Sequence, residues 1–564
     1  MVDESANEQW TNWAGNQSLT PYRHCHPRSL EDLIAIVQEA ELNGKRVRAV
    51  GSSWSFSDIA MTGDYLVETN EISSVLTTVL SSALNARAAG RQLVQVEAGI
   101  KVRDLCNYLD TQGLALTTMG GSDGQSLAGI LSTSVHGPDF DRGPVPDMVR
   151  AVHIVGPGGV QHWIEPAGGI TDPSALQQVL AIDPANIHYD DDWFNSIIVS
   201  VGTLGIIYAV ILEVTGQYDL VEVITTDTWS SVRAQLVSGT PFQPPNRCVQ
   251  VAIDPTSPHV CYLYMRTEGP ATKPAPYELY QDPLGLFCTT AVADAIIFVP
   301  TGAALFLAAA APFIPLLPPP LDAVFGGLLV AGTATAVAVA PLAAALSLIP
   351  GALGDVIAAT LNGNPGLTAQ VVSYMTSSSI PVGPPRRGFA HTIMSGPNPG
   401  QCAARGLALE IAFDATNGSH LSFVDDALPL LDQWFVNEGL ALPGWFSLRF
   451  VGRSRAYLAP QNRCNRTCMI EIVGLRGFDS TALILDRLEA LGRKHKGIQH
   501  WGMFRNLSYA DVARAYPRLD SWRRIRWQLT NKGTIRTFDN DFSVRTGLSA
   551  PPVNDMSYLV PLLP

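Results

Sequence analysis

Two loops rich in glycine and serine limit most strongly what this chain can fold into. The first lies in RAVGSSWSFSDIA, residues 48–60, and the second in TTMGGSDGQSLAGILSTSVHG, residues 117–137. Small residues let a backbone approach a ligand closely, and successive N–H groups in such loops form a concave site for an anion. Neither loop has the GxxxxGK[ST] motif or a well-placed GxGxxG motif. Plain turns share this composition, so composition alone leaves both a nucleotide cofactor and simple turns open.

Helices and strands alternate around these loops. Ser29 can cap a helix that ends at Gly44, and residues 46–51 form a short strand that runs into the first loop. The other predicted elements are a strand over 93–100, a helix over 101–116, a hairpin over 148–163 and a helix followed by an apolar strand over 194–215. The first 215 residues therefore predict an α+β domain with short strands.

Residues 284–360 differ from the rest of the chain in composition. No residue between Asp294 and Asp322 is charged, and none between Asp322 and Asp355. Each stretch exceeds the roughly 18 residues that suggest a membrane span, but prolines interrupt both, and a proline inside a helix costs about 3 kcal/mol. Three interpretations remain open: a buried or self-associating helical insert, which is favoured, a hairpin in one membrane leaflet, and a two-pass span.

Globular patterns return after residue 386. Strands are predicted over 408–415, 445–452 and 468–475, and an amphipathic helix over 481–495. A chain of 564 residues is too long for one ordinary core, so two or three domains are expected. A net charge of −13 repels phosphate backbones and argues against a nucleic-acid partner.

Metal and targeting signals are weak. The eight cysteines show no zinc spacing, and Cys25 between His24 and His26 is too isolated a pattern to predict a site, so no metal is expected. The first residues, MVDESANEQW, lack the basic and apolar regions of a signal peptide. A cytoplasmic or peripheral membrane location is therefore expected.

The order of the motifs carries more information than each motif alone. GSSWSFSDIA, a Gly-Gly-Ser loop, LAGILSTSVHG and VSVGTLGIIYAVIL follow one another within residues 20–215. This arrangement resembles the FAD-binding domain of the vanillyl-alcohol-oxidase (PCMH-type) flavoproteins. Near the chain end, GIQHWGMFRN, YPRLDSW and FDNDFSVRTGL resemble the sugar-lactone and alditol oxidase branch of that family. The resemblance implies an α+β, two-domain fold: an FAD-binding domain over 1–220, a substrate (cap) domain over 221–499 with the apolar insert 284–360, and a return over 500–564 to the first domain.

The resemblance also implies where FAD binds. The Gly51–Ser55 loop holds the diphosphate, residues 119–137 run along the ribityl chain and the ring, and the 500–501 segment returns to the ring. The predicted FAD-binding residues are Val50, Gly51, Ser52, Ser53, Trp54, Ser55, Met119, Gly120, Gly121, Ser122, Ser126, Gly129, Ser132, His136, Gly137, Gly202, Ile207 and Trp501.

One position departs from the pattern of many relatives. They carry a histidine directly before the serine of the first loop, and that histidine bonds covalently to the flavin. Trp54 stands there in this chain, and an indole cannot form that bond. FAD is therefore expected to be held non-covalently. His136 lies in a motif that the family shares, and it is interpreted as a packing and hydrogen-bonding residue.

Flavin-dependent alcohol oxidation needs a base for the hydroxyl proton and stabilisation of developing charge. In the lactone and alditol branch, a Glu-x-Arg pair, a strand histidine and the lysine of a His-Trp-Gly-Lys motif face the flavin. Here Arg449 keeps its position, whereas Ser447, Glu471 and Met503 replace the other three. These replacements argue against polyol and sugar-lactone substrates. The predicted catalytic residues are Arg449, Glu471 and His500, with Ser447 and Met503 contacting the substrate, although Glu–Arg pairs on strands are often structural.

Together these features predict an FAD-dependent oxidoreductase that acts on the C–OH group of a small hydrophobic, sterol- or terpenoid-like alcohol. Oxygen is favoured over other electron acceptors on branch resemblance. The insert 284–360 is alternatively a contact with a membrane surface or with a second copy of the chain. A berberine-bridge-like oxidative cyclase is an alternative, although the second loop lacks the cysteine of that group. A membrane-associated flavin-binding protein without alcohol oxidation is another.

Overall fold

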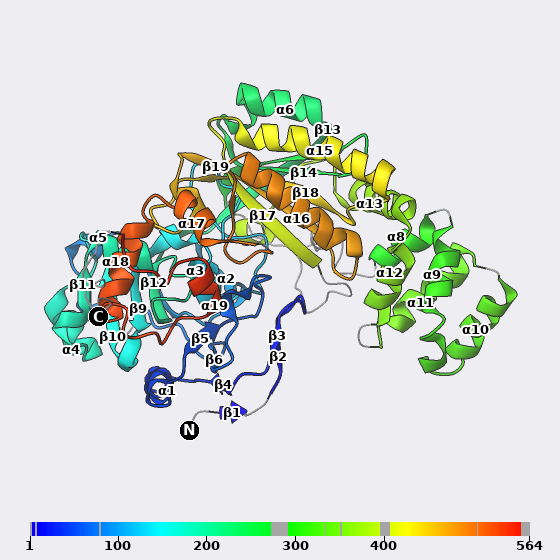
Figure 1. Ribbon diagram of the computed structural model, residues 1–564. Coiled ribbons are helices and arrows are strands. Elements are labelled where there is room, and N and C mark those ends of the chain that lie inside the picture. The colour runs from blue at the N-terminus through cyan, green and yellow to red at the C-terminus, as the bar shows by residue number, and fades with distance from the viewer. Residues whose placement is uncertain are drawn as a thin grey trace, which may run out of the picture. The chain divides into compact units, whose positions relative to one another are not determined.

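The computed structural model describes residues 3–5, 8–77, 81–271, 291–299, 301–332, 334–349, 352–394, 406–504 and 506–553. The chain divides into two compact units (Figure 1). The first comprises Met1–Tyr218, Val451–Thr467 and Ile498–Pro564, and the second comprises Asp219–Phe450 and Cys468–Gly497.

The stretch 451–467, which was expected in the substrate domain, groups with the first unit. It belongs to the first unit because its polar groups are satisfied there. The backbone N–H of Gly452 donates to the carbonyl of Arg142 over 2.8 Å, and the Ser134 hydroxyl donates to Gln461 Oε1 over 2.9 Å.

The first unit contains two main sheets. A four-stranded sheet has the order β1 (Asp3–Ser5), β4 (Arg23–His26), β6 (Tyr65–Glu68) and β5 (Val47–Val50). A second sheet has the order β11 (Ile187–Tyr189), β10 (Gln161–Glu165), β9 (Val149–Val155), β12 (Ile206–Gly216) and β7 (Gln92–Glu97), with β8 (Leu114–Ala115) paired to β12. The predicted hairpin is confirmed as β9 and β10, and its turn contains Pro157–Gly159.

Helix α1 (Leu30–Leu42) shows why the local sequence folds as it does. Ser29 caps it by accepting a hydrogen bond from the backbone N–H of Asp32 over 3.2 Å, as predicted. Its apolar stripe, which includes Leu33 and Val37, is fully buried against the four-stranded sheet. Strand β5 follows and leads directly into the first glycine–serine loop. The other helices of this unit are α2 (Val102–Thr111), α3 (Leu127–Ser132), α4 (Pro173–Leu180), α5 (Asp191–Ile197), α17 (Tyr509–Ala515), α18 (Leu519–Leu529) and α19 (Asp541–Arg545).

The second unit is built on a larger sheet. Its strand order is β16 (Arg386–Phe389), β13 (Tyr218–Thr228), β15 (Val260–Pro270), β14 (Asn246–Ile253), β18 (Gly444–Gly452), β19 (Arg466–Leu475) and β17 (Gly406–Asp414), with the short β20 (Ile498–Gln499) at the end. The strands predicted over 408–415, 445–452 and 468–475 are confirmed as β17, β18 and β19.

Two long helices, α15 (Ser419–Glu438) and α16 (Asp479–Lys494), cover one face of this sheet. Phe450 on β18 meets His420 on α15 with ring centroids 5.6 Å apart, and Phe413 on β17 meets Phe423 on α15 at 4.9 Å. Side chains alternate between the two faces along a strand. Even-numbered residues of β18 and odd-numbered residues of β17 therefore face the helices, and the residues between them face the other way. Helices α6 (Trp229–Ser238) and α14 (Ala390–Met394) complete this part.

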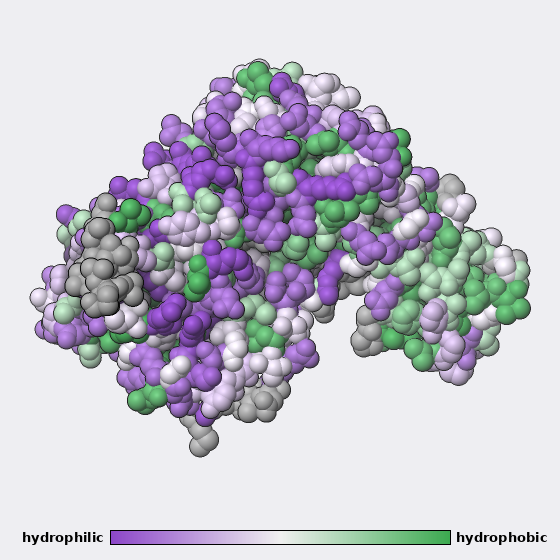
Figure 2. Space-filling model, viewed as in Figure 1, coloured by the Kyte–Doolittle hydropathy of each residue, from purple (hydrophilic) through white to green (hydrophobic). Residues whose placement is uncertain are grey.

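The apolar insert folds into short helices. They are α8 (Ala291–Phe298), α9 (Gly302–Ala310), α10 (Leu321–Ala331), α11 (Ala336–Leu346) and α12 (Ala352–Leu361), followed by α13 (Pro365–Ser379). Residues 284–290 of the predicted insert lie outside the described residues. Side chains such as Phe306 and Leu342 are fully buried, whereas Val330 and Val337 are exposed, and Figure 2 shows apolar residues gathered over this region. Within the described ranges, no helix combines the length and apolarity needed to cross a membrane.

Candidate functional site

The two glycine–serine loops lie in direct contact in the first unit. A Cβ atom at Gly51 would lie 1.8 Å from Ser126 Oγ and 2.8 Å from Ser126 Cβ, so only glycine fits there. Ser53 adopts a left-handed backbone with φ of 59°, and its carbonyl accepts a hydrogen bond from the backbone N–H of Trp13 over 2.8 Å. Contact between the two loops allows both to reach one ligand.

Three serine hydroxyls in these loops suit an anionic ligand. Ser52, Ser122 and Ser126 each have a buried Oγ that forms no hydrogen bond within the described residues. Ser126 precedes helix α3, but its side chain does not cap that helix. A buried hydroxyl without a partner costs about 1–3 kcal/mol, so three in two touching loops call for an explanation. They fit the diphosphate of FAD, whose oxygens accept hydrogen bonds.

The later predicted segments lie against the same loops. The backbone N–H of Val201 donates to the carbonyl of Ser132 over 3.2 Å, which brings the neighbouring Gly202 to the end of helix α3. The backbone N–H of Phe56 donates to the carbonyl of Gly502 over 2.8 Å, which ties the 500–502 segment to the first loop. Four segments far apart in sequence therefore meet in the first unit.

Two histidines lie together where these segments meet. The rings of His136 and His500 are edge to face, with centroids 6.3 Å apart. His136 Nδ1 donates to the carbonyl of Gly137 over 3.0 Å, and the backbone N–H of Gly502 donates to His500 Nδ1 over 3.2 Å. Accepting that bond leaves the proton of neutral His500 on Nε2. Both histidines are buried and have fixed orientations, which suits a binding surface.

The remaining predicted FAD residues differ in their surroundings. Val50, Met119 and Ile207 are buried. Trp501 is fully buried, stacks on Tyr516 with centroids 5.0 Å apart and donates from its indole nitrogen to the carbonyl of Leu458 over 2.6 Å. Its ring is therefore part of the core that supports the 500–502 segment. Ser55, Gly120 and Gly121 lie in the loops, whereas Gly129 lies on helix α3.

Trp54 occupies the position at which the family resemblance implied a linking histidine. Its ring stacks on Trp13 with centroids 5.5 Å apart and an interplanar angle of 20°. Trp13 also meets Phe56 edge to face at 6.3 Å. The first loop therefore ends in an aromatic cluster and has no nucleophilic side chain at this position.

Arg48 supports the loops and was not predicted from the sequence. Its side chain is buried, and its guanidinium donates to four backbone carbonyls: Gly202 over 2.7 Å, Val201 over 3.0 Å, Phe538 over 3.1 Å, and Ile59. Burial lowers the pKa of Arg48 to about 10, so it remains charged at neutral pH. One side chain thus holds together the backbone of three segments around the first loop. The only signal in the sequence was an arginine in an otherwise apolar strand.

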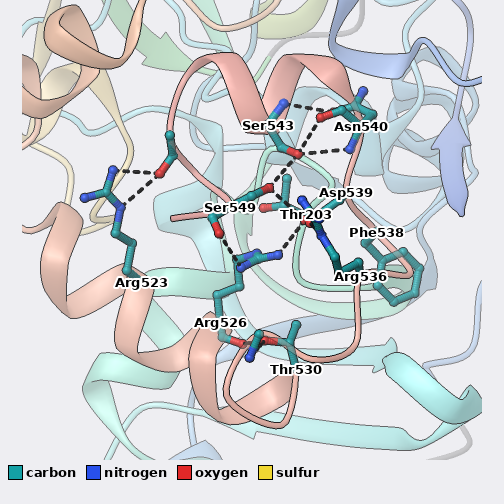
Figure 3. A network of polar contacts seen from close by, with 12 residues as sticks. Thr203, Arg523, Arg526, Thr530, Arg536, Phe538, Asp539, Asn540, Ser543 and Ser549 are labelled. Carbon is teal, nitrogen blue, oxygen red and sulfur yellow. Dashed lines mark hydrogen bonds and ion pairs between the residues drawn. The ribbon is translucent and has the colours of Figure 1, made fainter. Parts of the chain in front are cut away.

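The C-terminal motif FDNDFSVRTGL belongs to a network of polar contacts, which Figure 3 shows around Asp539 and Asn540. Asp539 is buried and accepts hydrogen bonds from Arg526 and Arg536. The Asn540 side chain caps helix α19 and donates to the carbonyls of Ile59 over 3.1 Å and Met61 over 3.0 Å. No role was assigned to this motif from the sequence. In the structure it supports residues 59–61, which follow the Gly51–Ser55 loop.

Arg449 and Glu471 form a buried ion pair in the second unit. Arg449 Nη2 donates to Glu471 Oε2 over 2.9 Å, and the two side chains are 11 % and 6 % exposed. They stand on the neighbouring strands β18 and β19, as expected. Both point to the face of the sheet opposite α15 and α16, because Phe450 points toward those helices.

The ion pair is one part of a longer polar row on that face. Gln250 on β14 is paired with Arg449 in register, and its side-chain nitrogen donates to Ser447 Oγ over 3.2 Å. Arg266 on β15 donates to Gln250 Oε1 over 3.3 Å and to Glu222 Oε2 on β13 over 2.8 Å. The row crosses five adjacent strands with two arginines, two glutamates, a glutamine and a serine. Gln250, Arg266 and Glu222 were missed from the sequence, although each is polar within an apolar strand.

His420, Glu410 and His391 lie in the second unit, and Met503 lies in the first. His420 is buried against Phe450, and burial lowers its pKa to about 4, which fits a neutral packing residue. Glu410 is buried on β17 and, by alternation, lies on the same sheet face as Arg449. His391 lies on the short helix α14, and Met503 lies in the first unit beside Gly502, half-buried.

Comparisons with known proteins bear on both units. Residues 22–165 match the family described as FAD binding domain, and residues 401–543 match the family described as D-arabinono-1,4-lactone oxidase. The first match contains both glycine–serine loops, and the second contains Ser447, Arg449, Glu471 and His500.

Characterised relatives align with only part of this chain. A D-arabinono-1,4-lactone oxidase from Eremothecium gossypii is 30 % identical over 215 residues, which are 38 % of this chain and 35 % of that protein. An L-gulonolactone oxidase from Scyliorhinus torazame is 31 % identical over 27 % of this chain and 32 % of its own length. An L-gulono-1,4-lactone dehydrogenase from Mycobacterium tuberculosis is 32 % identical over 27 % and 33 %. The matched region thus spans about a third of these relatives.

Solved structures resemble the fold over nearly the whole chain. A solvent-stable cholesterol oxidase superposes with a TM-score of 0.65 at 14 % identity and covers 97 % of this chain and 98 % of its own. Cholesterol oxidase from B. sterolicum gives 0.63 at 12 % identity, with 97 % of each chain covered. At this identity the likeness shows the fold, and the described chain therefore has a cholesterol-oxidase-like two-domain architecture.

Proposed function

Because the chain belongs to the vanillyl-alcohol-oxidase (PCMH-type) family of FAD-dependent oxidoreductases and its cofactor is FAD, we propose that it oxidises a C–OH group of a sugar lactone. The polar row on the sheet of the second unit is the observation that carries this proposal. A substrate with several hydroxyl groups needs many polar partners, and Gln250, Ser447 and Arg449 offer donors and acceptors on one face.

When bound, FAD supplies the acceptor for the hydride that leaves the substrate carbon. The chain must supply the group that takes the hydroxyl proton. Glu471 is suited to this task because its carboxylate accepts protons, and its ion pair with Arg449 fixes its position. Arg449 is suited to bind a substrate oxygen, since a guanidinium offers several donors in a fixed plane. His500 accepts a hydrogen bond from the backbone N–H of Gly502 at Nδ1, so its Nε2 is the donor nitrogen of the neutral ring in the first unit.

The sugar-lactone class replaces the hydrophobic alcohol expected from the sequence. That expectation followed from three replaced positions and the apolar insert. The replaced positions suggested too few polar partners for a sugar lactone. The fold adds Gln250, Arg266 and Glu222 to the same face of the sheet. The names of the relatives also favour lactones.

A hydrophobic alcohol is the second candidate, and a specific observation favours it. Beside the polar row, the same sheet carries an apolar cluster that includes Ala252, Tyr262 and Tyr264, and Ile380 after helix α13 packs on it. An amphipathic substrate could place its hydroxyl on the polar row and its apolar body on this cluster.

Reduction of the flavin without oxygen distinguishes the two candidates. The purified protein, loaded with FAD, is mixed under nitrogen with D-arabinono-1,4-lactone, with L-gulono-1,4-lactone or with cholesterol in detergent micelles. Bleaching of the visible flavin band by a lactone, with none by cholesterol, supports the proposal. Bleaching by cholesterol alone selects the second candidate, and no bleaching by any of the three contradicts both substrate classes.

Oxygen is proposed as the electron acceptor, since lactone oxidases are among the relatives. One relative is named a dehydrogenase, so the acceptor needs its own test. After anaerobic reduction, admitting air should restore the flavin band and release hydrogen peroxide. A band that recovers only with an added dye would contradict the oxidase proposal.

A further inference from the structure

A group of metal-binding side chains lies at the four-stranded sheet of the first unit. Glu8, His24 and His26 each place one ligand atom so that all three atoms lie within 4.8 Å of one another. His24 and His26 are two residues apart on β4, so alternation puts both imidazoles on one face, and their ring centroids are 4.4 Å apart. The cysteine between them, Cys25, is buried on the opposite face in the apolar core.

The buried ring of His24 points one unused nitrogen into this group. Its side chain is only 6 % exposed, and its Nδ1 forms no hydrogen bond within the described residues. One carboxylate oxygen of this group, Oε2 of Glu8, lies 3.8 Å from Nδ1, too far for a hydrogen bond. Two atoms that share a metal ion at about 2.0–2.2 Å lie roughly 3.4 Å apart in a tetrahedral site. Closing the group onto one ion thus requires movements of about 1 Å, and the exposed side chain of Glu8 can supply much of them.

The other ring nitrogen of His24 contacts a carboxylate, which is a usual partner of a histidine that binds a metal ion. His24 Nε2 lies 3.2 Å from Oε2 of Glu68 on the neighbouring strand β6. A carboxylate oxygen accepts hydrogen bonds, so the proton on Nε2 donates to Glu68, and in this tautomer the lone pair of the ring lies on Nδ1. A carboxylate behind a histidine in this way orients the ring and raises its basicity as a ligand.

We propose that Glu8, His24 and His26 bind a zinc ion, with Glu68 as the carboxylate that orients His24. Two imidazole nitrogens and one carboxylate oxygen are ligands that zinc accepts, and a fourth position is left for water. The ion would fasten the segment that contains Glu8 to β4. It would thereby brace the sheet whose strand β5 leads into the first glycine–serine loop. The sequence did not predict this site because His-Cys-His alone is weak, and the fold adds both glutamates.

Equilibrium dialysis of the FAD-loaded protein against Zn²⁺, with bound metal measured by atomic emission, tests the site. We expect one zinc ion per chain in the wild type, and loss of that ion in His24→Gln and His26→Gln. Glu68→Gln should weaken binding by about 10- to 100-fold, the usual effect of removing such a supporting carboxylate. His188→Gln is the matched control: this half-buried histidine of the same unit stacks on Trp193 at 3.7 Å and lies outside the group.

Glu8→Gln keeps the test decisive if a histidine variant does not fold. Glu8 is exposed, and its replacement removes one ligand without disturbing the core. We expect it to weaken zinc binding at least tenfold and to reduce the rise in melting temperature that zinc produces in the wild type. Equal zinc binding by the wild type, Glu8→Gln and His26→Gln would overturn the proposal, as would a wild type that retains no zinc. Because the readout is bound metal, the result is independent of the proposed oxidoreductase activity.

Discussion

Gly51→Ala tests the contact between the two glycine–serine loops. The added Cβ would lie 1.8 Å from Ser126 Oγ and 2.8 Å from Ser126 Cβ. The hydroxyl can rotate away, but the Cβ cannot, and ordinary contact begins near 3.4 Å. The loops must therefore separate by about 0.6 Å or more, a strain of the kind that costs about 1–3 kcal/mol.

This strain should appear mainly as weaker FAD binding, since both loops are proposed to contact the same diphosphate. At tenfold per 1.4 kcal/mol, a cost of about 1–3 kcal/mol weakens the affinity for FAD by about 5- to 140-fold. The assay is titration of the deflavinated protein with FAD, followed by the quenching of flavin fluorescence. Circular dichroism of the same samples shows whether the variant is folded.

Gly63→Ala is the matched control, because a Cβ there meets no atom within 4 Å and the residue does not have a positive φ. It should bind FAD as the wild type does. Removing the clash as well, in the double variant Gly51→Ala with Ser126→Gly, should recover part of the lost affinity. If Gly51→Ala bound FAD as tightly as Gly63→Ala, the two loops could not form one binding surface in the way described.

Three further predictions concern the first unit. Acid precipitation should release the flavin into the supernatant, since Trp54 cannot bond to it; flavin that stays in the pellet would show a link to another residue. Arg48→Met leaves buried carbonyls without their donor and should lower the free energy of unfolding by about 3–5 kcal/mol. Urea denaturation should show this as a lower midpoint. An unchanged midpoint would contradict the role given to Arg48. Burial lowers the pKa of His153 to about 4, below its value of 6.5 in the unfolded chain. Between these two values the unfolded state binds a proton that the folded state does not. The free energy of unfolding therefore falls as the pH drops from 6.5 toward 4. His153→Gln should therefore lose less stability than the wild type between pH 7 and 5, by about 2 kcal/mol, and an equal loss in both would refute this.

Much of the first unit could be predicted from the sequence because its signals are local. Ser29 and Gly44 mark the ends of α1, and the glycine–serine loops follow their strands in the order of the family. Local spacing also placed α16 and the strands that carry Arg449 and Glu471. Such features depend on neighbouring residues, so a single sequence contains them.

The features that were missed depend on contacts between distant residues. Arg48 binds carbonyls of residues 59, 201, 202 and 538, and nothing in the strand around it indicates those partners. Gln250 and Arg266 become part of one polar row only when β14, β15 and β18 lie side by side. The return of residues 451–467 to the first unit likewise depends on tertiary hydrogen bonds.

The apolar insert shows that composition alone does not identify a ligand. Its uncharged stretches suggested a hydrophobic substrate. In the structure its helices bury apolar side chains such as Phe306 and Val356 within their own bundle. The residues proposed to bind substrate stand on the sheet instead. Low charge in one segment therefore indicates what that segment packs against, which need not be the ligand.

The most direct test of the account compares two buried carboxylates of the second unit. Glu471 pairs with Arg449 on the polar face, whereas Glu489 pairs with Arg493 on helix α16, on the opposite side of the sheet. Flavin reduction by a sugar lactone is followed without oxygen in a stopped-flow instrument for Glu471→Gln and Glu489→Gln. Loss of a general base should slow reduction by about 10²- to 10⁴-fold in Glu471→Gln, while Glu489→Gln reduces its flavin at nearly the wild-type rate. Equal rates in the two variants would contradict the proposed role of the polar face.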